Sequence, residues 1–280
     1  MTDRSAADAT GPFGPRIDAR RHLAADRAGF LRVLTDLTPD DWTRSTAAAP
    51  WTVHDVVAHV LGDDLGRLGR DRDGYTAGGP RQGEPFPAFI YRLNDEWVRA
   101  ATRLSPRLLR ELLDVTSPQV TAYWNGVDLD AIGGPVTWAG PEPAPVWLDC
   151  ARDFTEYWVH QQQVREATGR PGGTDPDVVH AVLDTFLRAM PHTLSGLERP
   201  DDATLTVAVP GPAGGRWSWR RAGGRWSFVD ATETGTTATL DADVLWRLCV
   251  RMVEPEDVRF AVDGDRALAD AALQIVSIIR

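Results

Sequence analysis

A carboxylate and an imidazole stand four residues apart in the stretch 153–160, Asp-Phe-Thr-Glu-Tyr-Trp-Val-His. The surrounding segment, 146–168, has the pattern of one long helix, in which Glu156 and His160 would lie on one face, a turn apart. A carboxylate oxygen and an imidazole nitrogen so placed are two ligands of a divalent-metal site. An exposed Glu–His pair on a helix surface is the commoner arrangement. The metal interpretation therefore requires a third ligand from elsewhere in the chain.

His59 is the candidate for that third ligand. A capping box formed by Thr52 and Asp55 predicts that a helix begins directly after Thr52. At helical spacing His59 and Asp63 fall together at the border of the apolar stripe, one turn apart. Asp64 lies on the stripe itself, where an acid is unusual unless a cation satisfies it. Asp63 has two interpretations of equal weight: a metal-shell or substrate role, or an ordinary helix acid near an Arg.

Long amphipathic helices are expected to position these side chains. Apolar spacing and stop signals predict four of them, over 17–37, from 53 onward, over 86–104 and over 146–168. Ser105-Pro106 predicts a further short helix. The stretch 115–145, rich in Pro and Gly, is expected to be an irregular lid or pocket wall. The pattern predicts a helical bundle, with Glu156, His160 and Gln163 as a polar patch at the mouth of its core.

The pattern changes after a Gly/Pro-rich run at 172–176. Helices are expected over 177–190, 241–253 and 266–279, and strands over 204–209, 216–221, 225–229, 236–240 and 258–262. Gly-rich turns between the first three strands indicate a β-meander. We therefore predict three parts: a loose N-terminal leader (1–15), a helical bundle (16–172) and a small α+β domain (173–280).

Composition excludes several functions. The 280 residues carry a net charge of -10, which argues against a general nucleic-acid binder. No apolar run reaches the length of a membrane span, and residues 1–15 lack the apolar core of a signal peptide, so a cytoplasmic location is expected. All 30 basic residues are Arg, which excludes mechanisms that need a Lys amine and indicates a GC-rich, actinobacterial type of genome. Cys150 and Cys249 have no Cys-x-x-Cys spacing and are expected to be buried packing residues.

The order of these motifs resembles a known family. The stretch 51–60, Trp-Thr-Val-His-Asp-Val-Val-Ala-His-Val, is followed about a hundred residues later by Glu156-x-x-x-His160 and by the run 158–171 that ends the bundle. This pattern resembles the mycothiol-dependent maleylpyruvate isomerase family, whose members are DinB-like metal-binding four-helix bundles. The resemblance spans 17–172. The α+β part is similar to the sterol-carrier-like C-terminal domain that many members carry.

The resemblance implies a metal site and a thiol co-substrate. Carried over by position, the metal ligands are His59, Glu156 and His160. Two His and one carboxylate with a position left open is the pattern of a catalytic zinc site, although other divalent ions fit. The co-substrate would be mycothiol, whose thiolate is a strong nucleophile toward a small electrophilic substrate. At Gln163 members often have Asp, so this chain departs from the pattern beside the metal; Gln163 and Asp63 are candidates for roles around the metal. His54 is taken as exposed or as a neighbour of the site.

Guanidinium groups are the expected partners of a dicarboxylate substrate. Arg92, Arg220 and Arg221 are the candidates, against the commoner interpretation of a solvated surface Arg.

Three functions stay open at this point. The first is a metal- and mycothiol-dependent isomerase or S-transferase. The second is a metal-dependent hydrolase on the same bundle, and the third is a non-catalytic protein that binds a small molecule. No Gly-x-Ser-x-Gly, Gly-x-Gly-x-x-Gly or His-Glu-x-x-His motif supports another enzyme class. The sequence does not indicate an oligomeric state.

Overall fold

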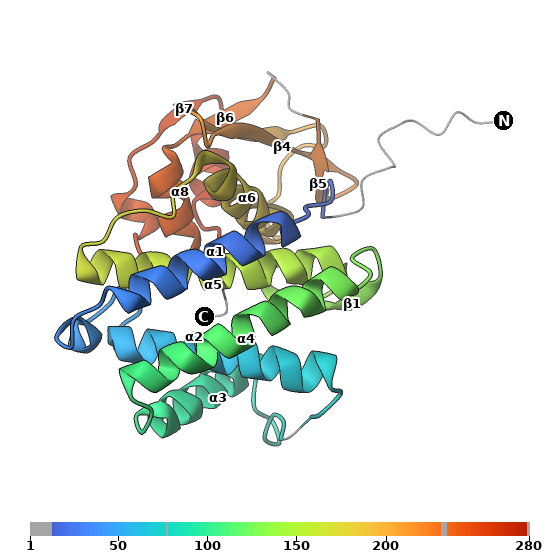
Figure 1. The fold of residues 1–280 in the computed structure, drawn as a ribbon. Helices are drawn as coiled ribbons and strands as arrows, with labels where there is room; N and C mark the ends of the chain where they lie inside the picture. The colour runs from blue at the N-terminus through green and yellow to red at the C-terminus, as the bar shows by residue number, and fades with distance from the viewer. Residues whose placement is uncertain (1–12, 77, 231–233, 279–280) are drawn as a thin grey trace. The chain divides into compact units, whose positions relative to one another are not determined.

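The computed structural model describes residues 13–76, 78–230 and 234–278, and Figure 1 shows its elements. Residue contacts divide the chain into two compact units. We call the first the helical unit; its described residues lie within 19–128 and 153–173. We call the second the sheet unit; its described residues lie within 13–18, 129–152 and 174–278. The predicted boundary at 172 and the leader at 1–15 stay predictions, and residues 1–12 lie outside the described residues.

Five helices carry the helical unit. They are α1 (Arg20–Thr35), α2 (Val53–Gly66), α3 (Phe86–Ala101), α4 (Pro106–Gly126) and α5 (Val146–Thr168). The helices predicted from 53 and over 146–168 are confirmed. The one predicted over 86–104 ends at Ala101, and the one over 17–37 is shorter at both ends. The division between the two units falls within α5, after Arg152.

The predicted short helix after Ser105 is wrong in length, and the irregular stretch predicted over 115–145 is wrong in its first part. Helix α4 continues to Gly126, through Pro118. A proline inside a helix costs about 3 kcal/mol. Leu109 and Leu113 before the proline and Trp124 after it are fully buried, and each such side chain gains roughly 1.5–3 kcal/mol on burial. Packing of one apolar face therefore outweighs the local helix-breaking signal.

The remainder of the predicted irregular stretch belongs to the sheet unit. Strands β1 (Ile132–Pro135) and β2 (Pro143–Pro145) pair antiparallel, with a 3-10 helix at Thr137–Ala139 between them.

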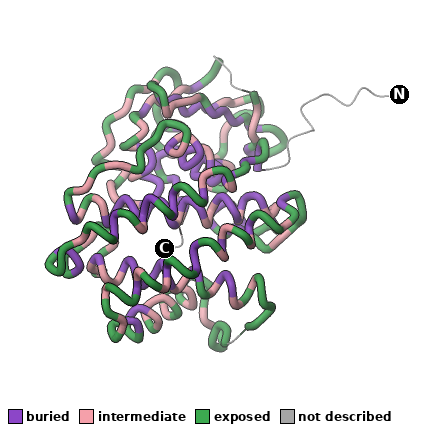
Figure 2. Tube along the Cα trace, in the orientation of Figure 1, coloured by how far each residue is buried: buried purple, intermediate pink, exposed green. Residues whose placement is uncertain are grey.

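The apolar core of the helical unit joins α1, α2, α4 and α5. Phe30 and Leu34 of α1, Leu61 of α2, Leu109 of α4 and Val164 of α5 are among its fully buried members. Helices α1 and α2 pack on α4, and α3 packs on α2. In α3 only Val98 and Ala101 are buried, so α3 borders the core rather than filling it, as the exposed and half-exposed colours along it in Figure 2 show.

The sheet unit contains a five-stranded mixed sheet. Its strands are β3 (Thr204–Val209), β4 (Gly215–Ala222), β5 (Arg225–Val229), β6 (Thr236–Thr239) and β7 (Ala261–Asp263), in the order β5-β4-β3-β6-β7. The predicted meander is confirmed for β3, β4 and β5, and β6 adds to β3 in parallel. Gly223 and Gly224, both with positive φ, form the two-residue turn between β4 and β5.

Four helices of the sheet unit are α6 (Pro176–Phe186), α7 (Met190–Thr193), α8 (Ala242–Cys249) and α9 (Arg266–Ala272). The predictions for 241–253 and 266–279 are too long, since α8 ends at Cys249 and α9 at Ala272. The strand predicted over 258–262 lies at Ala261–Asp263. In the described part of the chain, no helix is long and apolar enough to cross a membrane.

Candidate metal centre

Helix α2 presents His59 toward the inside of the bundle. The predicted capping box is confirmed: the Thr52 side chain accepts from the backbone N–H of Asp55, and the Asp55 carboxylate accepts from the backbone N–H of Thr52. This fixes where the helix begins and therefore which residues face inward. His59, seven residues after Thr52, is 4% exposed. The half-buried ring of Trp51 lies against its imidazole, with 4.8 Å between ring centroids.

Helix α5 presents the other two predicted ligands on one face. Glu156 and His160 are a turn apart, as the spacing predicted, with His160 Nε2 3.2 Å from Glu156 Oε1. His160 is buried and Glu156 is half-buried. On the far side of the ring, His160 Nδ1 lies 2.8 Å from the side-chain oxygen of Gln163.

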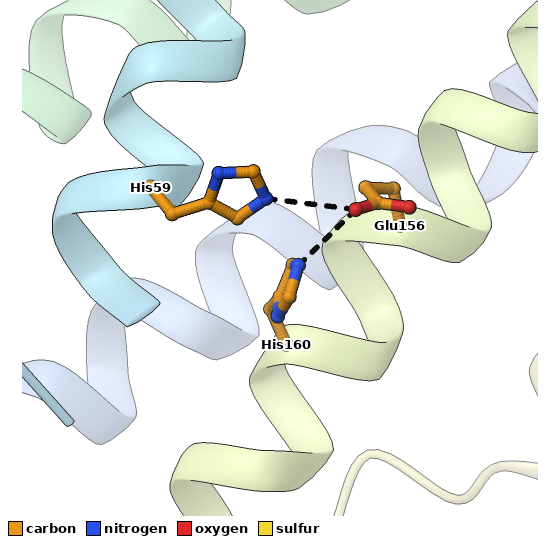
Figure 3. A group of neighbouring side chains, drawn as sticks. All are labelled: His59, Glu156 and His160. Atoms are coloured by element: carbon orange, nitrogen blue, oxygen red, sulfur yellow. Dashed lines mark hydrogen bonds and ion pairs between the residues drawn. The ribbon is translucent and has the colours of Figure 1, made fainter. Parts of the chain in front are cut away.

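The three side chains meet across the two helices, as Figure 3 shows. His59 Nε2 is 3.6 Å from Glu156 Oε1, the same oxygen that His160 Nε2 faces. The two imidazole rings are 4.7 Å apart and nearly perpendicular, at 84°. One potential ligand atom from each residue lies within 4.8 Å of the others. This set, His59, Glu156 and His160, is called the His–Glu–His cluster below.

The cluster consists of acceptors that need a positive charge between them. A neutral imidazole nitrogen without a proton and a carboxylate oxygen both carry lone pairs, so they repel at these distances unless a proton or a cation lies between them. The pKa values of His59 and Glu156 shift in the directions that favour a positive imidazole beside a negative carboxylate. Burial alone would lower the pKa of His59, but Asp63 and Glu156 outweigh it and raise that pKa above its usual value. Burial would raise the pKa of Glu156, but hydrogen bonds from His160 and His59 hold it well below its usual value.

Asp63 lies beside the cluster, where the helical spacing predicted it. Its Oδ2 is 3.3 Å from His59 Nε2, and its side chain is 40% exposed. Loss of hydration raises the pKa of the Asp63 carboxyl, His59 opposes the rise and Glu156 adds to it. Asp63 and Glu156 also line a narrow recess in the helical unit. An acid that is both near the cluster and open to solvent can exchange protons with a bound molecule.

Two of the three predicted substrate-binding arginines pair with acidic side chains in the structure. Arg92 donates two 2.8 Å hydrogen bonds to the Glu84 carboxylate and also approaches Glu96. In the sheet unit Arg221 pairs with Glu198 and Asp201, whereas Arg220 is exposed on β4. Their role toward a substrate stays a prediction.

Sequence reasoning did not find a second buried cluster in the helical unit. Arg27 of α1 donates to Asp64 of α2 at 2.7 Å, and the two side chains are 4% and 1% exposed. The Asp64 carboxylate also accepts from Thr116 of α4 at 2.6 Å. Asp153 of α5 accepts from Arg67, the residue that follows α2. The one signal was Asp64 on an apolar stripe. Its partner lies 37 residues away, beyond the reach of helical periodicity.

His54, His22 and both cysteines lie away from the His–Glu–His cluster or contact other groups. His54 Nε2 faces the backbone carbonyl of Leu104 at 2.9 Å and is half-buried. His22 stacks on Phe154 in the helical unit. Cys150 and Cys249 are buried, as predicted, and burial raises the pKa of Cys249 to about 12.

Fold and site together define a helical-bundle protein, with a small mixed-sheet unit, that has a candidate centre of two His and one carboxylate. The family model of the mycothiol maleylpyruvate isomerase N-terminal domain matches residues 23–165, more than half of the chain. The chain therefore belongs to this family, and the predicted resemblance and fold class are confirmed.

Solved structures with a similar fold are also found. The crystal structure of the mycothiol-dependent maleylpyruvate isomerase is similar to this chain at 12% sequence identity, with a TM-score of 0.52 over 82% of this chain and 86% of that one. The crystal structure of a His-to-Ala mutant of that isomerase matches with the same values. At this identity the likeness is one of fold. No curated protein sequence matches the chain significantly.

Proposed function

We propose that this protein is a metal- and mycothiol-dependent isomerase or S-transferase that acts on a small electrophilic molecule. The observation that carries the proposal is the His–Glu–His cluster, in which one potential ligand atom from each of three side chains lies within 4.8 Å of the others. Membership of the family supports the thiol co-substrate.

The donor set fits a divalent metal. His59, Glu156 and His160 would hold it through two imidazole nitrogens and one carboxylate oxygen, the set found in catalytic zinc sites, which keep a further position open. Bound there, zinc would supply one piece of chemistry, a lowered pKa for the thiol of mycothiol, so that it is a thiolate near neutral pH.

The protein's own residues would orient the reaction and handle the proton. Trp51 covers one side of His59 and limits the access of water to it. Asp63 is the group best placed to accept the proton that the thiol loses, because it lies beside the cluster and is partly exposed. Arg92, Arg220 and Arg221 remain the proposed partners of substrate carboxylates.

The thiolate sulfur would form a bond to an electrophilic carbon of a conjugated double bond, whose electron pair moves onto the neighbouring carbonyl group. In isomerisation, rotation about the resulting single bond precedes cleavage of the same sulfur–carbon bond, which restores the double bond in the other geometry. In S-transfer the sulfur–carbon bond stays, and the proton held by Asp63 returns to the adduct.

A thiol-dependence assay tests the proposal. Zinc-loaded protein is incubated with maleylpyruvate, or with 1-chloro-2,4-dinitrobenzene as a second electrophile, in the presence and absence of mycothiol. We expect turnover that requires mycothiol and that is lost in His59→Ala but kept in His54→Ala. Equal turnover without any thiol would replace the proposal by the metal-dependent hydrolase or another thiol-free reaction. No turnover of either compound with mycothiol would favour the non-catalytic binder.

A further inference from the structure

The side chain of Gln163 contacts His160 on the side of the ring that faces away from Glu156. Its amide oxygen lies 2.8 Å from His160 Nδ1, and both residues are buried, at 6% and 7% exposure. The two residues are three apart on α5, so the contact is made within one turn of a single helix. The opposite ring nitrogen, Nε2, is the one that faces the Glu156 carboxylate.

This contact determines which nitrogen carries the proton. An amide oxygen only accepts hydrogen bonds, so His160 Nδ1 must be the donor and carry the hydrogen. The lone pair of the other nitrogen, Nε2, which lies on the side of Glu156 and the centre of the cluster, is then available to a cation bound there. We propose that Gln163 is a positioning residue, which holds His160 in the one tautomer and the one ring orientation in which Nε2 can bind a cation. The inference rests on the metal site of the proposed function.

The neutral amide differs from a carboxylate at the same place. A carboxylate as partner of a ligating His makes the imidazole more basic and adds a negative charge near the metal. The cluster already contains Glu156, with Asp63 beside it. Gln163 fixes the ring without a further charge. With Gln163, a zinc ion in the cluster would be held less tightly than with a carboxylate at position 163, but less of its positive charge would be neutralised by the protein.

The other imidazole of the cluster, that of His59, is held in a different way. Among the described residues, no hydrogen-bond partner faces Nδ1 of His59, whose ring is instead held by packing against Trp51. Loss of the Gln163 hydrogen bond would therefore release one of the two imidazoles and leave the other unchanged.

Zinc affinity tests the inference without any assay of turnover. Zinc dissociation constants are measured by competition with a chromogenic chelator for the full-length wild type, Gln163→Met, Gln163→Glu and Gln162→Met. Gln162 is a matched control: it is the same residue type, next in the helix and 6% exposed, but its amide donates to the carbonyls of Gly172 and Gly173. We expect Gln163→Met to weaken zinc binding about 10–100-fold. We expect Gln163→Glu to bind zinc at least as tightly as the wild type, and Gln162→Met to stay within about threefold of it.

Imidazole nitrogen NMR of zinc-loaded wild type adds a direct readout. Zinc on Nε2 of His160 and a proton on Nδ1 are the expected result. A proton on Nε2 would overturn the inference, and so would a loss of affinity in Gln163→Met no larger than in Gln162→Met. These outcomes leave the proposed function standing. A wild type that binds no zinc would instead remove the proposed metal site, and the inference with it.

Discussion

Two buried polar clusters in the helical unit both draw on α2 and α5, yet they are built on opposite principles. In the first, here the ion-pair network, Arg27 pairs with Asp64 and Arg67 with Asp153, so every charge has a partner of opposite sign. In the His–Glu–His cluster two imidazoles face one carboxylate, and the set includes no Arg. Buried charge is tolerated only when it is paired or coordinates a metal. The charges of the network are therefore all paired within the chain, whereas the cluster needs a proton or a cation between its side chains.

The ion-pair network and the His–Glu–His cluster should therefore affect different properties of the protein. The ion-pair network should contribute to folding whether or not a metal is present, because its partners are all residues of the chain. The cluster should contribute to metal binding and little to the stability of the metal-free protein. Four predictions test that division, from the largest expected effect to the smallest.

Removal of one ligand should abolish zinc binding. Binding of zinc to structural sites is worth about 10–16 kcal/mol, or about 2.5–4 kcal/mol for each of four ligands, so loss of one ligand weakens it roughly a hundredfold to a thousandfold. We expect His59→Ala to retain no stoichiometric zinc after dialysis, as measured by elemental analysis. His54→Ala is the matched control, since His54 lies on the same helix and faces a backbone carbonyl. One equivalent of zinc in His59→Ala would mean that the cluster is not the metal site.

Removal of one partner from the ion-pair network should destabilise the fold. Asp64→Ala leaves the 4%-exposed Arg27 without its 2.7 Å partner. Because an uncompensated buried charge costs about 3–5 kcal/mol, and Asp153 at 3.8 Å gives Arg27 partial compensation, we expect a loss of about 3 kcal/mol in urea unfolding.

Two further variants show whether the loss of stability comes from the unpaired buried charge. The double variant Arg27→Met/Asp64→Leu removes both charges and should recover much of the loss. Glu111→Ala breaks the exposed Arg107–Glu111 pair and should leave the free energy of unfolding nearly unchanged, because solvent screens such a pair. If Asp64→Ala stays as stable as the wild type but loses zinc, the two clusters do not have separate roles.

Asp26 tests what happens to a buried carboxylate that lacks an ionic partner. Its Oδ1 accepts from Gln161 at 2.6 Å, while Oδ2 has no hydrogen-bond partner among the described residues. Burial raises the pKa of Asp26 to about 7, against the opposing effects of Gln161, Arg27 and Arg165. An acid whose pKa is higher in the folded than in the unfolded state makes the fold less stable as pH rises from about 4 to about 7.

Asp26→Asn should therefore gain stability over the wild type at pH 8 and much less at pH 5. A change of one in pKa is worth about 1.4 kcal/mol, and relaxation around a buried group reduces the effect, so we expect about 2 kcal/mol at pH 8. Urea unfolding of both proteins at the two pH values measures it. An Asp26→Asn effect that is the same at pH 5 and pH 8 would show that Asp26 does not titrate in this range.

Local features of the site could be predicted from the sequence, whereas the contacts between helices could not. The helical spacing of Glu156 and His160 is a periodic signal, and the capping box before His59 is a local one. The structure brings these three side chains together. Their role as ligands stays a prediction. The pairing of His59 with α5 came from the resemblance to a family, because no periodicity relates residues a hundred positions apart.

Most of the contacts that could not be predicted from the sequence depend on residues outside the local segment. Asp64 was recognisable as an acid on an apolar stripe, but Arg27 as its partner was not. Pro118 gave a local signal to end a helix, and burial of apolar residues on both sides of it outweighed that signal. Arg92 was a reasonable carboxylate ligand by type, and the structure pairs it with Glu84 of its own unit.

The smallest expected effect concerns the start of α2, which carries residues of both clusters. In Thr52→Ala the cap hydrogen bond to the backbone N–H of Asp55 is lost, which costs about 1 kcal/mol in unfolding free energy. Because His59 lies two turns further along α2, zinc affinity should stay within about threefold of the wild type, less than the loss of a direct partner of a ligand causes. Ser105→Ala, at the N-cap of α4, is the control for capping in general. Zinc affinity that falls tenfold in Thr52→Ala but not in Ser105→Ala would show that the His–Glu–His cluster depends on the register of α2, and that stability and binding are coupled through this helix.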